Sequence, residues 1–284
     1  MRRMPALDGL RAIAVLLVFS GHLAQLRTKD FDAFAIAGVY IFFWISGYII
    51  TRTLVEESNL SGSFSLKNFY IRRACRILPP LWLFLFVVSM LGHNREAAFA
   101  LTFLCNTSIL GNCGYYVGHT WSLAFEEQFY FVYPMILALL LFHRRPGFAL
   151  APAIAFALLP LIFPGWLGRS GFFEVYALLS LGAFAAIYQR RLPQPPMVIK
   201  RLLSIQPLPY IGRISYSVYL WQQLATRPEV PAEWRVPAIV GVFVLSALSF
   251  HTFEAWFISW GRSQTVRLTN QSSSEVAPTA RTRS

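Results

Sequence analysis

Apolar runs long enough to cross a bilayer recur along almost the whole of this 284-residue chain. A helix needs about 20 consecutive apolar residues to span the hydrocarbon core. In lipid the backbone polar groups must be satisfied within the segment, which favours helices. The sequence therefore predicts an all-α protein, a polytopic transmembrane helical bundle of about eight spans. The runs lie near 8–26, 37–55, 77–92, 121–142, 148–165, 171–189, 208–226 and 236–258.

Composition supports an integral membrane protein over its full length. Hydrophobic residues make up 56% of the chain and charged residues only 13%, whereas soluble domains carry about 25% charged residues. The net charge of +12 could indicate a protein that binds nucleic acid. However, the basic residues lie in short clusters between apolar runs, as in cytoplasmic loops. We therefore expect contact with the lipid bilayer and with an anionic ligand, and no nucleic-acid partner.

A further apolar run, 97–110, is too short to span and carries Asn106, Thr107 and Ser108. At about 14 residues it is typical of a re-entrant or interfacial segment. The basic clusters fall on one side of the membrane only if this run does not cross. We therefore expect both termini to be cytoplasmic. Arg2 and Arg3 precede the first run without a convincing cleavage site, so we interpret that run as a retained span.

The three cysteines, Cys75, Cys105 and Cys113, show no paired spacing typical of zinc, and no metal site is expected. Cys105 and Cys113 share a segment predicted to lie outside, where a disulfide could form. Unpaired buried thiols fit the sequence equally well.

From about 262 the chain is polar and lacks the apolar content to pack. We expect a membrane domain over 1–261 and a disordered cytoplasmic tail over 262–284, with no internal repeat.

Two ionisable residues, Arg11 and His22, lie inside the first apolar run with ten residues between them. At about 100° per residue they share one helix face, roughly 16 Å apart along the axis. Ionisable groups in membrane helices are usually functional. Neutral imidazole suits removal of a hydroxyl proton, although His22 could be a packed, hydrogen-bonded residue. Arg11 could bind phosphate or carboxylate, or could be a snorkelling arginine paired with Asp8.

Two further patches carry candidate residues. Arg73 and Arg76 stand three residues apart on a basic stretch that enters the third run. Clustered arginines bind phosphates well, but arginine is also ordinary at cytoplasmic helix ends. Glu126 stands near the start of another run, where a buried carboxylate could orient His22 or hold its protonated form. A solvated acidic pair with Glu127 is the alternative.

Five segments together resemble the acyltransferase 3 family of membrane acyltransferases. The resemblance runs in order from about residue 5 to about 258. The segments are PALDGLRAIAVLLVFSGH, FFWISGYIIT, FYIRRACRILP, HTWSLAFEEQFY and GRISYSVYLWQ.

The resemblance implies an O-acyltransferase of the bacterial inner (plasma) membrane, in which His22 is the catalytic base. Glu126 and Arg11 would support His22, while Arg73 and Arg76 would bind the donor acyl-CoA, with acetyl-CoA expected. The acceptor would be a hydroxyl of a carbohydrate or another small molecule.

The sequence also departs from the family pattern. The family typically has ten spans, an acidic residue where Tyr40 stands, and often a histidine at Gln222. A membrane transporter and a shortened, inactive family member remain alternatives.

Overall fold

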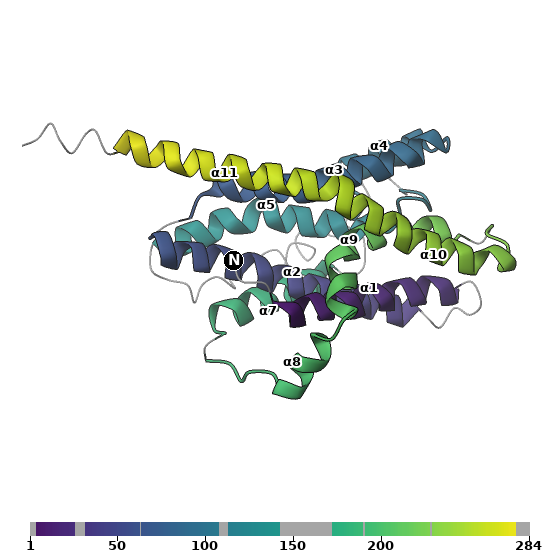
Figure 1. Ribbon diagram of the computed structural model, residues 1–284, viewed down its shortest axis with the longest axis horizontal. Coiled ribbons are helices and arrows are strands. Elements are labelled where there is room, and N and C mark those ends of the chain that lie inside the picture. The colour runs from purple at the N-terminus through teal and green to yellow at the C-terminus, as the bar shows by residue number, and fades with distance from the viewer. Residues whose placement is uncertain are drawn as a thin grey trace, which may run out of the picture.

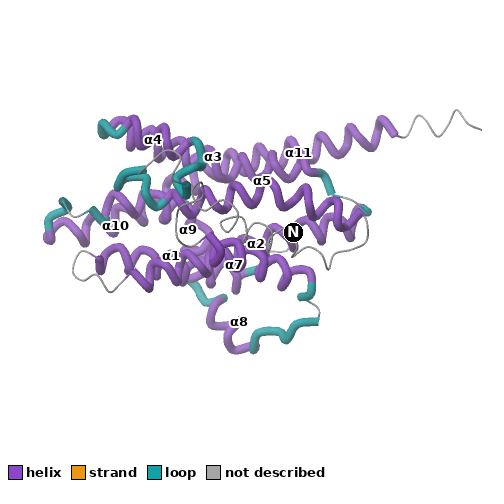
Figure 2. The backbone as a smooth tube through the Cα atoms, turned by 180° about the vertical axis from the view of Figure 1, so that it is seen from behind, coloured by secondary structure: helices purple, strands orange, loops and turns teal. Residues whose placement is uncertain are grey.

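The computed structural model describes residues 4–25, 32–62, 64–107, 113–142, 172–189, 191–227 and 229–276. Every regular element in this part of the chain is a helix (Figures 1 and 2), which confirms the all-α prediction. The helices are α1 (Pro5–Gln25), α2 (Asp32–Ser61), α3 (Leu66–Met90), α4 (Asn94–Leu101), α5 (Thr120–Phe142), α7 (Phe172–Ile187), α8 (Met197–Leu203), α9 (Leu208–Ala225), α10 (Ala232–Ser249), the π-helical turn η3 (Phe250–Glu254) and α11 (Ala255–Val276).

Within the described residues, five helical segments are long and apolar enough to cross a membrane. They are Pro5–Leu23, Ala33–Leu60, Leu66–Met90, Thr120–Leu141 and Ala232–Val266. The shorter helix α7 is also apolar. The run predicted at 148–165 lies outside the described residues. The chain is thus a polytopic membrane protein, and the count of eight spans with cytoplasmic termini stays a prediction.

The segment expected not to cross is short in the structure too. Helix α4 has eight residues, which corresponds to about 12 Å of helix, and turns follow it as far as Thr107. Cys105, after these turns, is bonded to Cys113, with the two Cα atoms 5.7 Å apart. The disulfide ties this segment to the chain that leads into α5. Of the two states that the sequence allows for these cysteines, the structure has the bridged one.

Close contact between backbones holds the bundle together. Helix α1 packs against both α2 and α9, and α2 packs against α7. A Cβ atom at Gly212 of α9 would overlap the carbonyl oxygen of Asp8 in α1, and one at Gly47 of α2 would overlap that of Leu179 in α7. Small residues at helix contacts are typical of membrane bundles. Gly47 therefore allows α2 and α7 to approach closely.

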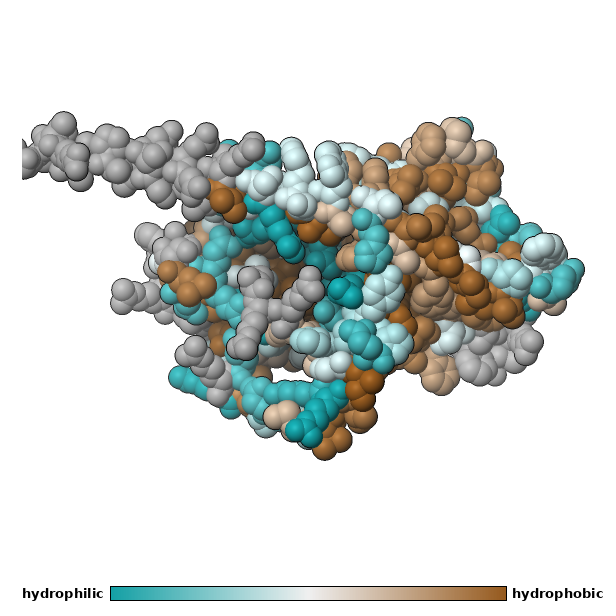
Figure 3. Space-filling view, viewed as in Figure 1, coloured by the Kyte–Doolittle hydropathy of each residue, from teal (hydrophilic) through white to brown (hydrophobic). Residues whose placement is uncertain are grey.

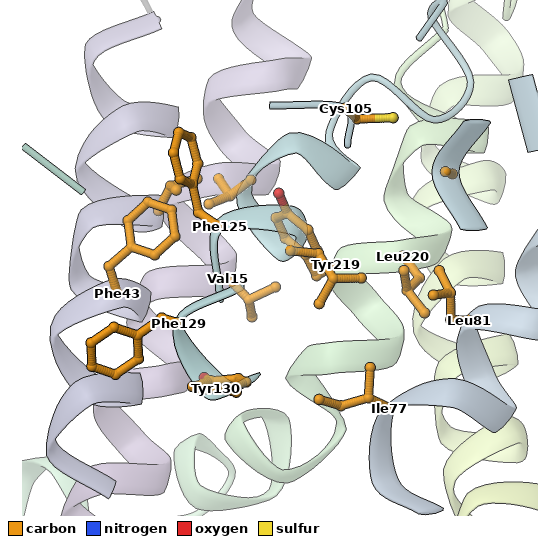
Figure 4. Close-up of a cluster of buried hydrophobic side chains, with 14 of the residues drawn as sticks. Val15, Phe43, Ile77, Leu81, Cys105, Phe125, Phe129, Tyr130, Tyr219 and Leu220 are labelled. Atoms are coloured by element: carbon orange, nitrogen blue, oxygen red, sulfur yellow. The ribbon is translucent and has the colours of Figure 1, made fainter. Parts of the chain in front are cut away.

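The core forms where five helices meet (Figure 4). It contains fully buried side chains from α1, α2, α3, α5 and α9, namely Val15, Phe43, Leu81, Phe125 and Leu220. Figure 4 also gives the core a direction, because Ile77 and Tyr130 lie toward one end and Cys105 toward the other.

Helices α10, η3 and α11 form one long strut along the side of the bundle, and α8 projects on the opposite side (Figure 1). Large apolar side chains on the strut are exposed, and Figure 3 shows apolar surface over α10. In a bilayer this surface faces acyl chains. Helix α11 continues to Val276, beyond residue 262 where we place the start of the tail. A polar sequence can extend an existing helix, because propagation needs only local backbone bonds.

Candidate active site

A cavity opens between α1, α2, α3, α5 and α9, and three arginines and one glutamate line it. Apolar side chains of α2 form much of the remaining wall. The residues around the cavity are Arg11, Val39, Phe42, Phe43, Ile45, Ser46, Ile49, Ile50, Arg73, Arg76, Ile77, Ser122, Leu123, Glu126, Tyr130, Ser215, Tyr216 and Tyr219. Four of the five candidate site residues thus meet at one cavity.

Both carboxylate oxygens of Glu126 are engaged. The Ser46 hydroxyl on α2 donates to Oε1 over 2.8 Å. The Tyr130 hydroxyl donates to Oε2 over 2.9 Å. Tyr130 follows Glu126 by four residues and therefore shares its face of α5. The carboxylate is held in place by its own helix and by α2.

Arg73 of α3 completes this network. Its guanidinium carbon lies 3.6 Å from the centre of the Tyr130 ring. Its Nη2 atom lies 3.7 Å from Glu126 Oε2 and 3.8 Å from Glu127 Oε1. The Nε atom is buried and has no hydrogen-bond partner among the described residues. Arg73 is therefore fixed by one ring and two carboxylates and keeps a donor for a ligand.

Arg11 and Arg76 bring further positive charge to the cavity. The Nε atom of Arg11 is buried and has no hydrogen-bond partner in the described part of the chain. Arg76 is exposed at the cavity wall, and the charges of Arg11 and Arg73 act on it. Three arginines against one lining glutamate give a positive field, which attracts anions.

His22 does not line this cavity. It lies near the far end of α1 from Arg11, and its charge acts on His119. The geometry also differs from the expectation that Glu126 orients His22. Glu126 is committed to Ser46, Tyr130 and Arg73 because these side chains reach it from three helices.

Tyr219 and Ser122 connect the cavity to the histidine region. Both line the cavity, and their hydroxyl oxygens lie 2.6 Å apart. The Tyr219 hydroxyl donates to the backbone carbonyl of His119 over 2.7 Å, and Ser122 donates to the same carbonyl over 3.3 Å. The Tyr219 hydroxyl points toward the Cys105 end of the core (Figure 4). The hydroxyls of Tyr219 and Ser122 therefore link the cavity wall to the backbone carbonyl of His119.

The sequence analysis missed His119 as a site residue. Its side chain is 5% exposed, and its ring packs edge-to-face on Phe84 and Tyr219 at 5.5 and 5.3 Å. Burial, together with the smaller effect of the charge of neighbouring His22, lowers the pKa of His119 to about 3. His119 is therefore neutral at physiological pH. A second histidine at the start of an apolar run was the available signal.

Two further side chains, those of Trp121 and Gln222, lie in or against the core. The Trp121 ring packs edge-to-face on Phe43 and Phe125 at 6.1 and 5.9 Å, which gives it a role in the core. Gln222 is fully buried, and neither polar atom of its amide has a hydrogen-bond partner among the described residues. The described residues contain no cluster of three or more histidine, cysteine or acidic side chains that could hold a metal ion.

The fold and the site together define a helical membrane bundle with an arginine-lined cavity and a neighbouring histidine pair. The chain belongs to the acyltransferase 3 family, because the family's acyltransferase domain matches residues 4–205. This confirms the family that the sequence motifs indicate.

Three proteins similar to this chain are named as O-acetyltransferases. Peptidoglycan O-acetyltransferase OatA of Listeria monocytogenes is 26% identical over 88% of this chain and 55% of its own length. A putative O-acetyltransferase of Staphylococcus aureus strain MSSA476 is 38% identical over 50% of this chain. O-acetyltransferase OatA of S. aureus strain NCTC 8325 is 34% identical over 51% of this chain.

The chain spans about half the length of the Listeria relative and about a quarter of the staphylococcal ones. No solved structure matches it.

Proposed function

We propose that this chain is a membrane O-acetyltransferase that moves an acetyl group from acetyl-CoA to a hydroxyl of a carbohydrate polymer. The observation that carries the proposal is the cavity in which Arg11, Arg73 and Arg76 meet. Family membership supplies the reaction class. The Listeria relative is a peptidoglycan O-acetyltransferase, which supports peptidoglycan as the acceptor.

The cavity wall has an arginine part and an apolar part, and each suits one part of the donor. Coenzyme A carries several phosphates, and arginine binds phosphate with two parallel hydrogen bonds. The buried Nε atoms of Arg11 and Arg73 offer donors without partners among the described residues. The apolar wall of α2, including Phe42, Ile45 and Ile49, suits the less polar pantetheine arm. We place the donor entrance on the cytoplasmic side, with the disulfide on the opposite side.

The transfer needs one base and one leaving group. His22 takes the proton of the acceptor hydroxyl, and the oxygen attacks the thioester carbonyl carbon. The carbon–sulfur bond breaks, and the CoA thiolate leaves and takes up the proton that His22 releases, which returns the imidazole to its neutral form. His119 is neutral, so a proton on His22 meets no second positive charge there. Tyr219 and Ser122 lie where the acetyl end of the donor approaches the histidines.

The test is acceptor-dependent release of CoA thiol by the full chain in lipid nanodiscs. We expect release with acetyl-CoA and peptidoglycan fragments, and a Michaelis constant for acetyl-CoA that rises about tenfold or more in Arg76→Ala, since hydrogen bonds to charged groups contribute about 1.5–3 kcal/mol. Arg72→Ala is the matched control, because Arg72 pairs with Glu57 at 2.7 Å outside the cavity. Solute flux without CoA release would instead identify a transporter.

A further inference from the structure

A cluster of aromatic and charged side chains lies next to the disulfide and outside the arginine cavity. We call it the tyrosine cap, and it consists of His93, Glu96, Tyr115, Tyr116 and Arg227. These residues come from the start of α4, from the turns that lead into α5 and from the chain directly after α9. None of the five lines the arginine cavity. The bond between Cys105 and Cys113 anchors the turns that carry the two tyrosines.

Tyr116 is the fixed centre of this cap. Its ring lies against the ring of His93, with the two centroids 3.8 Å apart. Its hydroxyl accepts a hydrogen bond from Arg227 Nη1 over 2.7 Å, and its backbone N–H donates to Glu96 Oε2 over 3.2 Å. The other oxygen of Glu96 lies 3.2 Å from His93 Nδ1. The ring, the hydroxyl and the backbone of Tyr116 are thus held by three different side chains.

Tyr115 is held by two hydrogen bonds and yet faces the surface. Its hydroxyl donates to the carbonyl of Thr226 over 2.7 Å, and its own carbonyl accepts from Gln223 Nε2 over 3.0 Å. Its ring stands at 89° to that of Tyr116, with the centroids 6.1 Å apart. Tyr115 is nevertheless 42% exposed. An exposed ring that is already ordered provides a binding surface that loses little conformational entropy when a ligand stacks on it.

Arg227 brings hydrogen-bond donors to the same surface. Its guanidinium carbon lies 5.5 Å from the centre of the Tyr116 ring. Among the described residues no carboxylate lies within 4 Å of it, and its Nε atom has no hydrogen-bond partner there. A guanidinium has five N–H donors, and only one bond is formed, to Tyr116. An aromatic face beside unused polar donors suits a pyranose sugar, which has an apolar C–H face and oxygens around its rim.

One face of α9 connects the tyrosine cap to the histidine end of the cavity. Tyr219 and Gln223 are four residues apart and share this face. Tyr219 bonds the carbonyl of His119, and Gln223 bonds that of Tyr115. From Tyr219 to Thr226, which accepts the Tyr115 hydroxyl, the helix rises by about 10 Å. This distance exceeds the length of one sugar ring and suits a chain of several.

We propose that the tyrosine cap is the binding site for the carbohydrate acceptor. One pyranose ring stacks on Tyr115, Arg227 donates hydrogen bonds to its oxygens, and another ring of the same chain presents its hydroxyl to His22. The inference rests on the proposed function, since it requires a carbohydrate acceptor on the disulfide side. An enzyme with this site prefers an oligosaccharide over a single sugar.

The experiment measures acetyl transfer by the full chain in nanodiscs to a peptidoglycan tetrasaccharide and to N-acetylmuramic acid alone. We expect Tyr115→Ala to raise the Michaelis constant for the tetrasaccharide about tenfold, as for the loss of an aromatic stacking contact. The constant for acetyl-CoA should change less than about twofold. Tyr115→Phe keeps the ring and should stay within about threefold of the wild type. Tyr188→Ala is the matched control, because Tyr188 packs on Phe184 and belongs to neither the cap nor the cavity.

Acceptor length supplies a readout that a merely structural role would not change. Tyr115→Ala should raise the Michaelis constant for the tetrasaccharide and leave that for the single sugar within about twofold. Arg227→Gln should have the same selectivity, with a rise of about three- to tenfold. Arg95→Gln is its control, because Arg95 is an exposed arginine of α4 that lies over Phe99. Equal rises for the tetrasaccharide and the single sugar would overturn the inference.

Binding of the tetrasaccharide, measured by equilibrium dialysis, separates this inference from the proposed function. If the wild type transfers acetyl and Tyr115→Ala leaves the constant for the tetrasaccharide unchanged, the inference fails and the proposed function survives. If the wild type binds the tetrasaccharide through Tyr115 but transfers no acetyl, the carbohydrate site stands and the proposed reaction is wrong. A folded wild type that neither binds nor acetylates the tetrasaccharide would overturn both.

Folding of each variant is checked by its melting temperature. Should Tyr115→Ala fail to fold, Tyr115→Leu replaces it, because leucine keeps apolar volume and the backbone bond from Gln223 but lacks the flat ring. We expect a Michaelis constant for the tetrasaccharide about fivefold above that of the wild type. An unchanged constant in that variant would overturn the inference.

Discussion

The hydroxyl of Ser46 on α2 donates a 2.8 Å hydrogen bond to the carboxylate of Glu126 on α5. The same carboxylate lies 3.7 Å from Arg73 on α3. Three segments that the sequence analysis treats separately therefore form one network. In this network Ser46 donates a hydrogen bond that orients Glu126, and Glu126 in turn faces Arg73, an arginine of the proposed donor site.

Loss of the Ser46 hydroxyl should weaken this orientation. In Ser46→Ala, Glu126 keeps the bond from Tyr130 and loses one of its two hydroxyl donors. We expect kcat/KM for acetyl-CoA to fall about three- to tenfold. This loss is smaller than the contribution of about 1.5–3 kcal/mol from a bond to a charged group, because the Tyr130 hydroxyl still holds the carboxylate. Steady-state CoA release measures the effect. Ser20→Ala is the control, because Ser20 is exposed and bonds only its own helix at Leu17. Equal losses in both variants would contradict the network.

The shape of the Arg73 side chain should matter as much as its charge. Arg73→Lys keeps a positive charge but loses the planar group that lies over Tyr130 and faces two carboxylates. We expect the Michaelis constant for acetyl-CoA to rise about tenfold. Arg72→Lys is the neighbouring control and should change it less than twofold. A fully active Arg73→Lys enzyme would mean that only charge is required.

Gln222 offers a prediction about stability. Its buried amide lacks hydrogen-bond partners in the described structure, whereas the amide of Gln223 donates to the Tyr115 carbonyl over 3.0 Å. We expect Gln222→Leu to stabilise the protein by about 1 kcal/mol, because an unpaired buried amide costs about 1–3 kcal/mol. The melting temperature should rise by about 2–4 °C. Gln223→Leu should lower it, and a similar loss in both variants would show that Gln222 is satisfied.

The disulfide provides a test of topology. Cys105 and Cys113 are bonded, and Cys75 is buried on α3. A membrane-impermeant maleimide applied to intact spheroplasts should label the chain only after mild reduction. The added label should disappear in Cys105→Ala/Cys113→Ala. Reduction should also destabilise the protein by about 2–3 kcal/mol, given the short loop that the bond closes. Labelling that requires permeabilised membranes would place this segment on the cytoplasmic side.

Much of the fold could be predicted from local composition. Apolar length identified the long helices. The run at 97–110 was predicted to be too short to span, and helix α4, which overlaps its start, has eight residues. The arginines and Glu126 were identified because ionisable residues are rare in such helices. The side chains that contact these residues were not identified, because they depend on which helix faces pack together in the folded chain. Tyr130 was not named either, although its spacing of four residues from Glu126 places it on the same helix face.

The missed residues depend on distant parts of the chain. His119 neighbours His22 of α1, and α9 packs Tyr219 against His119. Glu254 of η3 is buried where the strut packs on α3, and it accepts a hydrogen bond from Ser217 of α9. The extension of α11 to Val276 was missed for another reason, since composition alone does not reveal that a preceding helix continues.

The most direct test of the central claim is transfer of radiolabelled acetyl from acetyl-CoA to peptidoglycan fragments by the full chain and by His22→Ala in nanodiscs. His251→Ala is the control, because that exposed histidine contacts Tyr210 away from the cavity. If His22 is the base beside an intact donor cavity, His22→Ala lowers the transfer rate at least about a hundredfold, while acetyl-CoA binding measured by equilibrium dialysis stays within twofold. Transfer at the unmodified rate by a folded His22→Ala protein would contradict the account.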